Sequence, residues 1–248
     1  MIKIKSAHEI AKMRTAGRIT AETFEVLKEH IKPGITTKEL DKIAAEYINK
    51  CGADCSFYQY NGYPGHICIS VNDEVVHGIP GKRILREGDI VSVDAGACYD
   101  GYHGDAARTY AVGTVSPEAE KLISVTKQSF FEGIKYATAG NRLFDISAHI
   151  QEFVEENGCS VVRALVGHGI GGRLHEDPEV PNFGVCGRGP RLISGMTIAV
   201  EPMVNLGTYK VNTLSDEWTV VTADGALSAH YENTILITEN GAEILTKC

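Results

Sequence analysis

Four acidic residues and one histidine stand in glycine-rich or strand-like stretches of the sequence, where charged groups are unusual. They are Asp94, Asp105, His168, Glu201 and Glu232. A buried glutamate is rare without a partner, and lysine and arginine are scarce around Glu201 and Glu232. A buried salt bridge is the alternative for these two glutamates, but their surroundings favour a metal ion.

The two aspartates are predicted to lie on neighbouring strands of a hairpin. Asp94 ends an apolar run, and the strong hairpin-turn signal Asp100-Gly101 precedes Asp105. Folding about this turn sets Asp94 opposite residue 105, give or take two positions, with the carboxylates about 5–8 Å apart. Two buried like charges this close need a proton or a cation between them. The alternative is that both aspartates form surface turns.

Two histidines share the glycine-rich stretch from Gly167 to Pro178. His168 is expected to leave an apolar strand over residues 161–166 and enter a turn, with His175 at the far side of that turn. The flanking glycines would leave the imidazoles accessible. Each histidine could instead be a loop residue with a satisfied hydrogen bond, and spacing alone would allow both to be metal ligands.

Together the five residues supply four carboxylates and one imidazole. This is too acidic for a structural zinc site, which prefers sulfur and nitrogen ligands. It matches a two-metal hydrolytic centre, in which the ions lie about 3.5–4 Å apart and a shared water is the nucleophile. The oxygen-rich set favours harder ions such as Mn²⁺ or Fe²⁺ without selecting one.

Helices and strands alternate in blocks along the chain. Capping boxes at Ser6 and Thr36 begin the first two helices, and Ser116 followed by Pro117 begins the third. The expected helices cover residues 6–31, 36–52, 116–140 and 143–157. Short runs rich in β-branched residues predict strands within residues 57–115, 161–166, 196–204, 217–222 and 230–238. The order predicts an α+β fold of two similar halves, with helices covering a mostly antiparallel sheet in one compact domain.

Composition sets the context for this chemistry. The chain has 248 residues and a net charge of −8, which argues against binding DNA by bulk positive charge. Its N-terminus lacks a signal-peptide pattern, and no apolar run approaches the roughly 18–20 residues of a membrane span. Seven scattered cysteines without a Cys-x-x-Cys pair fit reduced thiols. We therefore expect a cytoplasmic protein.

Ordered motifs identify a family that the sequence resembles. They are His77-Gly78-Ile79-Pro80, Asp94-Ala95-Gly96, His103-Gly104-Asp105, Gly167-His168-Gly169-Ile170-Gly171, Leu174-His175-Glu176-Asp177-Pro178, Glu201-Pro202 and Tyr231-Glu232-Asn233-Thr234. The set resembles the type I methionine aminopeptidases over nearly the whole length. The resemblance implies the pita-bread fold, with two pseudo-symmetric halves and a curved sheet. It also implies one metallopeptidase domain over residues 1–248, without an N-terminal zinc-binding extension.

The resemblance implies an activity and a role for each site residue. The activity is removal of the initiator methionine from nascent polypeptides, with preference for a small second residue. By resemblance, the ligands of two divalent ions (Mn, Fe(II), Co, Zn or Ni) are Asp94, Asp105, His168, Glu201 and Glu232, with Asp105 and Glu232 bridging. Glu201 is similar to the family's proton shuttle. His175 would donate a hydrogen bond to the scissile carbonyl, and His77 would contact the backbone of the residue after methionine.

A pocket for the methionine side chain is expected from aromatic residues and one cysteine, a set that suits a flexible thioether. Its residues are Phe57, Tyr60, Tyr63, Cys68 and Trp218. Asn61 and Leu174 depart from the histidine and phenylalanine of many relatives. Asn72 and Ser228 match positions where some relatives bind a monovalent cation.

Two rival functions remain. The first is another pita-bread hydrolase, either an X-Pro peptidase or a metal-free amidinohydrolase relative. The motif at residues 77–80 argues against the former and the intact ligand set argues against the latter. The second is a non-enzymatic binding protein of this fold, which would be expected to have lost ligands. For the preferred function the partners are nascent N-termini near the ribosome, and the chain is expected to be a monomer without membrane contact.

Overall fold

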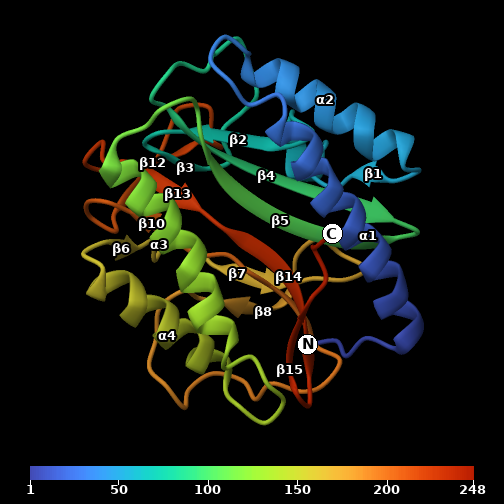
Figure 1. Cartoon of the computed structure of the whole chain (residues 1–248). Helices are drawn as coiled ribbons and strands as arrows, with labels where there is room; N and C mark the ends of the chain where they lie inside the picture. The colour runs from blue at the N-terminus through green and yellow to red at the C-terminus, as the bar shows by residue number, and fades with distance from the viewer.

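The computed structural model describes residues 1–248, which form four helices around a curled sheet (Figure 1). The helices are α1 (Ala7–Lys28), α2 (Thr37–Lys50), α3 (Pro117–Ile134) and α4 (Leu143–Glu156). Helices α1 and α2 pack over the first half of the sheet, and α3 and α4 over the second. The predicted α+β fold of two similar halves is confirmed.

Nine strands form the central sheet, and every pairing between its strands is antiparallel. They are β1 (Asp54–Cys55), β2 (Cys68–Val71), β4 (Ile90–Tyr99), β5 (Tyr102–Ala111), β7 (Gly167–Gly169), β8 (Glu176–Val180), β9 (Thr197–Val200), β14 (Glu232–Thr238) and β15 (Gly241–Ile244). Strand β14 pairs with β5 on one side and β9 on the other, so it joins the two halves.

Two three-stranded sheets flank the central one. The first contains β6 (Ser160–Val161), β10 (Met203–Asn205) and β13 (Ser228–His230). The second contains β3 (Glu74–Val76), β11 (Val211–Thr213) and β12 (Val220–Thr222). A short 3₁₀ turn, η1 (Tyr60–Gly62), lies between β1 and β2.

The predicted helix starts are confirmed, whereas one predicted helix end is wrong. Both capping boxes form, at Ser6 and at Thr36. Helix α3 ends at Ile134 and not near Gly140. Beyond Ile134 the chain turns, and Thr138 bridges Thr238 at the end of β14. This contact is distant in sequence, so the local pattern could not reveal it.

The predicted hairpin forms around Asp100-Gly101. Tyr99 pairs with Tyr102, and both turn residues have positive φ, as a tight two-residue hairpin turn requires. In this register Asp94 pairs with Ala107 and Gly96 with Asp105. Asp94 is thus offset by two positions from Asp105, within the predicted range, and the two lie on the same face of the sheet.

The predicted strand over residues 161–166 is largely wrong. Strand β6 ends at Val161, the chain then bends, and His168 lies inside strand β7 and not in a turn. A Cβ added at Gly167 would lie 2.4 Å from the Ala199 oxygen, and one at Gly169 would lie 2.1 Å from the Asp177 oxygen. The glycines around His168 therefore allow β8 and β9 to approach closely.

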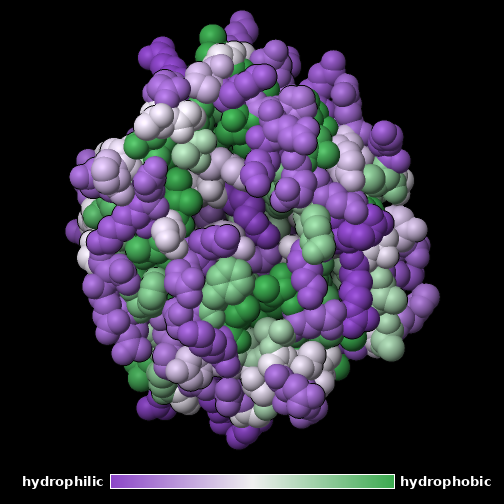
Figure 2. Space-filling view, viewed as in Figure 1, coloured by the Kyte–Doolittle hydropathy of each residue, from purple (hydrophilic) through white to green (hydrophobic).

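Hydrophobic residues on the face shown in Figure 2 form patches that hydrophilic residues interrupt. A hollow near the centre of that face corresponds to a cavity of about 440 Å³, lined by residues of α1, α3 and the C-terminal segment (Figure 2). None of the four helices combines the length and the apolar character that crossing a membrane requires.

Candidate active site

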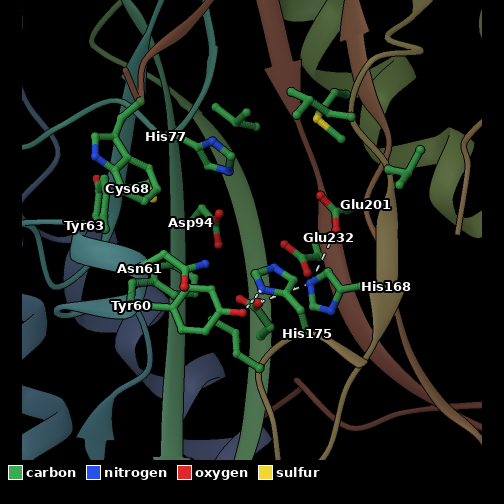
Figure 3. A pocket seen from close by; sticks show the side chains of 18 of the residues that line it. Tyr60, Asn61, Tyr63, Cys68, His77, Asp94, His168, His175, Glu201 and Glu232 are labelled. Atoms are coloured by element: carbon green, nitrogen blue, oxygen red, sulfur yellow. Dashed lines mark hydrogen bonds and ion pairs between the residues drawn. The ribbon is translucent and has the colours of Figure 1, made fainter. Parts of the chain in front are cut away.

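A second cavity, of about 360 Å³, contains every site residue expected from the sequence except the two cation candidates (Figure 3). The acidic and imidazole side chains come from strands of both halves. Asp94 lies on β4 and Asp105 on β5, whereas His168 lies on β7 and Glu232 begins β14. Glu201 directly follows β9, where Pro202 interrupts the predicted strand over 196–204.

The carboxylates and the imidazole converge on one point. His168 Nε2 lies 3.8 Å from Asp105 Oδ2 and 3.6 Å from Glu201 Oε1. One donor atom each from Asp105, His168 and Glu232 lies within 4.8 Å of the other two. This spacing suits side chains that surround a cation.

The buried carboxylates of this cluster lack a compensating positive charge. Asp94 Oδ1, Asp105 Oδ1 and Glu232 Oε1 are buried without a hydrogen-bond partner, and no lysine or arginine pairs with them. Burial and the neighbouring charges raise the pKa of Asp94, Glu201 and Glu232 well above the usual range. Burial raises the pKa of Asp105 to about 7. Because cations would offset this repulsion, these residues fit a divalent metal centre.

His168 has the tautomer that a metal ligand needs. Its Nδ1 lies 2.9 Å from the Gly169 carbonyl oxygen. A carbonyl oxygen can only accept a hydrogen bond, so Nδ1 must be the donor. The proton therefore sits on Nδ1, and the Nε2 lone pair faces the carboxylates. Burial lowers the pKa of His168 to about 3, so the ring is neutral.

His175 and His77 lie on the open side of the cluster (Figure 3). His175 Nδ1 is 2.7 Å from the Tyr60 hydroxyl. When that hydroxyl donates, the His175 proton is on Nε2, free to serve as a donor. His77 has a φ of 60°, and burial lowers its pKa to about 4. Both rings can therefore contact a bound molecule as neutral groups.

Apolar side chains form the adjoining wall of the cavity. The Tyr63 ring packs edge-on against Trp218 with centroids 5.1 Å apart, and the Tyr63 hydroxyl donates to the Gly78 oxygen. Cys68 on β2 pairs with Asp94, which places this wall beside the carboxylates. Phe57 completes the expected set. Asn61 and Leu174, the two residues at which the sequence differs from the family pattern, also line the cavity.

The sequence did not single out five residues that line the cavity, nor His230, which lies close to two of the glutamates without lining the cavity. Val76, Ala164, Leu165, Val166 and Met203 add apolar surface. His230 lies 3.9 Å from Glu201 and 3.8 Å from Glu232, measured from Nε2 to the respective Oε2. Its place two residues before Glu232 was the signal available in the sequence, although the two residues lie on different strands, β13 and β14.

The two residues expected near a monovalent cation lie side by side. The Ser228 amide donates to the Asn72 oxygen, and the Asn72 side chain contacts Asp89 and Ile90. Cation binding at this place stays a prediction.

Four helices around a curled antiparallel sheet, with buried carboxylates and an imidazole gathered from both halves, define the pita-bread metal-dependent hydrolases. Comparisons with known proteins agree. Residues 11–239 match the model of metallopeptidase family M24. Methionine aminopeptidase from Clostridium perfringens is 61% identical over 99% of both chains. The crystal structure of methionine aminopeptidase from Thermotoga maritima superposes with a TM-score of 0.99 at 48% identity, covering 100% of both chains.

The chain belongs to metallopeptidase family M24, within its methionine aminopeptidases. A prolidase from Pyrococcus furiosus shares the fold with a TM-score of 0.79, at 23% identity. This chain covers 65% of that prolidase. The likeness to the prolidase concerns the fold alone.

Proposed function

We propose that this protein removes the N-terminal methionine from nascent polypeptides by metal-dependent hydrolysis, with preference for a small second residue. One observation carries the proposal: a single cavity of about 360 Å³ holds the carboxylate cluster beside an apolar wall suited to a thioether side chain. The high identity to methionine aminopeptidases supports it.

The proposal assigns two divalent ions to the cluster. Their ligands would be Asp94, Asp105, His168, Glu201 and Glu232, with Asp105 and Glu232 shared. When bound, such ions polarise a carbonyl oxygen and acidify water, so that hydrolysis proceeds near neutral pH. Four carboxylates and one imidazole can accommodate Mn, Fe(II), Co, Zn or Ni.

The remaining steps fall to side chains of the chain. Glu201 takes a proton from the attacking water and delivers it to the departing amine. His175 donates from Nε2 to the carbonyl oxygen as negative charge develops there. His77 contacts the backbone of the second residue, while Phe57, Tyr63 and Trp218 enclose the methionine side chain.

The proposal has a cellular setting as well. The protein acts in the cytoplasm as a monomeric single domain over residues 1–248, on N-termini that emerge near the ribosome. A monovalent cation bound near Asn72 and Ser228 would brace the strands behind the cavity.

A peptide panel tests the activity. Purified protein is assayed on Met-Ala-x, Met-Phe-x, Leu-Ala-x and X-Pro peptides, before and after treatment with a chelator. We expect release of methionine from Met-Ala-x alone at an appreciable rate, loss of activity with the chelator, and recovery with Mn²⁺, Fe²⁺ or Co²⁺. The Asp105→Asn variant, prepared identically, controls for contaminating peptidases. Cleavage of X-Pro peptides, or full turnover without metal, would refute the proposal.

A further inference from the structure

His230 is a buried imidazole for which the reaction steps above provide no role. Its side chain is about 2% exposed, and neither ring nitrogen has a hydrogen-bond partner. Its backbone is held on β5, because the Thr109 hydroxyl contacts both the His230 amide and its carbonyl oxygen at 2.9 Å. A rigid, buried polar ring without partners is costly unless it serves another group.

The position of the ring shows which groups it can serve. His230 is not among the residues that line the cavity holding the carboxylates, but one of its ring nitrogens lies within 4.8 Å of a carboxylate oxygen of Asp94 and one of Glu232. Its Nε2 lies 3.9 Å from one oxygen of Glu201 and 3.8 Å from one oxygen of Glu232. Glu201 therefore presents Oε1 to His168 and Oε2 to His230.

Comparison with His168 indicates where the His230 proton lies. The Nδ1–H of His168 has a carbonyl acceptor, so that its Nε2 is a free lone pair. Nδ1 of His230 has no acceptor, whereas its Nε2 faces two carboxylate oxygens. A neutral imidazole in this environment is better placed with its proton on Nε2, because two carboxylate oxygens lie 3.8 and 3.9 Å from that nitrogen, just beyond hydrogen-bond distance.

We propose that His230 is a positioning residue that directs an Nε2–H group between the Oε2 atoms of Glu201 and Glu232. Resting on the proposed metal-dependent function, this inference adds a donor beside the ligand set. The positive end of this N–H dipole offsets the repulsion between the two carboxylates and favours the rotamers in which both approach Nε2. Their other oxygens are then oriented toward the metal ions before those ions bind.

The tautomer can be read directly in the unaltered protein. Imidazole ¹⁵N resonances are recorded for the Zn²⁺-loaded chain, and the His230 signals are assigned by their loss in His230→Gln. We expect a protonated Nε2 and an unprotonated Nδ1 for His230, the reverse of His168. A proton on Nδ1, with Nε2 unprotonated, would overturn the proposal, because that is the state of a direct ligand.

Variants test the consequence for metal binding without using peptidase activity. Binding of Mn²⁺ and Co²⁺ is measured by calorimetry, and the visible spectrum of the Co²⁺ form is recorded. His230→Gln keeps an N–H donor, so we expect near-wild-type affinity and spectrum. His230→Leu removes the donor, so affinity should fall about 10–100-fold, as is typical when a residue behind a ligand is lost. His149→Leu, on α4, is the matched control and should change neither quantity.

Two outcomes contradict the positioning role. Wild-type affinity in His230→Leu would show that the donor is dispensable. Loss of one ion in His230→Gln, as expected for His168→Gln, would make His230 a ligand. If His230→Leu fails to fold, the tautomer and His230→Gln still decide the question. Because no measurement uses peptide, failure of the proposed peptidase activity would leave these results interpretable.

Discussion

Three imidazoles near the carboxylates differ in what their Nδ1 atoms contact. His168 donates from Nδ1 to the Gly169 carbonyl, His175 meets the Tyr60 hydroxyl, and Nδ1 of His230 has no partner. A hydrogen bond at one ring nitrogen fixes which nitrogen carries the proton. The same side chain can therefore offer a lone pair at one position and an N–H at another.

This difference separates a ligand from a catalytic donor. We expect His175→Ala to keep near-wild-type metal content while kcat falls about 10²–10³-fold, the usual cost of removing one donor to a developing oxyanion. His168→Ala should bind one ion much more weakly, because it loses the Nε2 ligand. Metal stoichiometry by elemental analysis, beside kcat, checks both. Equal loss of metal in the two variants would show that the division of roles is incorrect.

Local patterns in the sequence revealed the acids but not His230. Asp94 and Asp105 could be paired because a two-residue turn fixes hairpin register. The approach of His230 to Glu201 depends on the pairing of β10 with β13, where Met203 lies opposite His230. That pairing joins segments far apart in the chain, so no local pattern could specify it.

At the scale of structural elements, the first residues of the helices were easier to predict than their last residues. A capping box is a contact between residues three apart, so the sequence alone predicted the starts of α1 and α2. The end of α3 depends on a bridge to β14, and the path around His168 depends on how closely β8 and β9 approach. These features are set by packing between distant segments.

Packing of α1 on β5 gives a prediction at this scale. A Cβ added at Gly104 would lie 2.6 Å from the Gly17 amide nitrogen, and the Thr20 hydroxyl donates to the Gly104 oxygen. We expect Gly104→Ala to force α1 away from β5 and lower the free energy of unfolding by about 1–3 kcal/mol. Urea unfolding of the metal-free protein measures this change.

A second glycine supplies the control. An added Cβ at Gly81 would have its nearest neighbour at 3.9 Å, so Gly81→Ala should change stability by less than about 0.5 kcal/mol. If Gly104→Ala proves as stable as Gly81→Ala, the helix and the strand are not in the tight contact described here.

Over the whole molecule, the active site depends on contacts that join distant parts of the chain. The N-terminal segment reaches the turn that carries His175 through an ion pair between Lys5 and Glu176, with Nζ and Oε2 2.7 Å apart. Both side chains are 4% exposed, and the Arg173 amide donates to the other Glu176 oxygen. The pair fixes the segment that precedes α1 against the cavity rim.

This pair should make stability depend on pH. Burial raises the pKa of Glu176, but the hydrogen bond and charge of Lys5 outweigh burial and leave it below the ordinary value of 4.5. The unfolded chain therefore takes up this proton first as the pH falls. The stabilisation is complete above pH 4.5 and is lost as the pH drops through the lower, folded-state pKa.

Glu176→Gln tests this contribution, because it leaves the Lys5 ammonium buried without its partner. At neutral pH we expect the free energy of unfolding to fall by about 3–5 kcal/mol, as when one member of a buried pair is removed. Below pH 4.5 the gap between variant and wild type should narrow, because the unfolded wild-type chain then binds a proton that the folded chain takes up only at its lower pKa. Glu46→Gln, from the exposed pair with Lys42, is the control and should cost less than about 1 kcal/mol. Urea unfolding across this pH range gives both curves. A gap that stays constant with pH, or one no larger than for Glu46→Gln, would mean that the Lys5–Glu176 pair does not anchor the N-terminal segment.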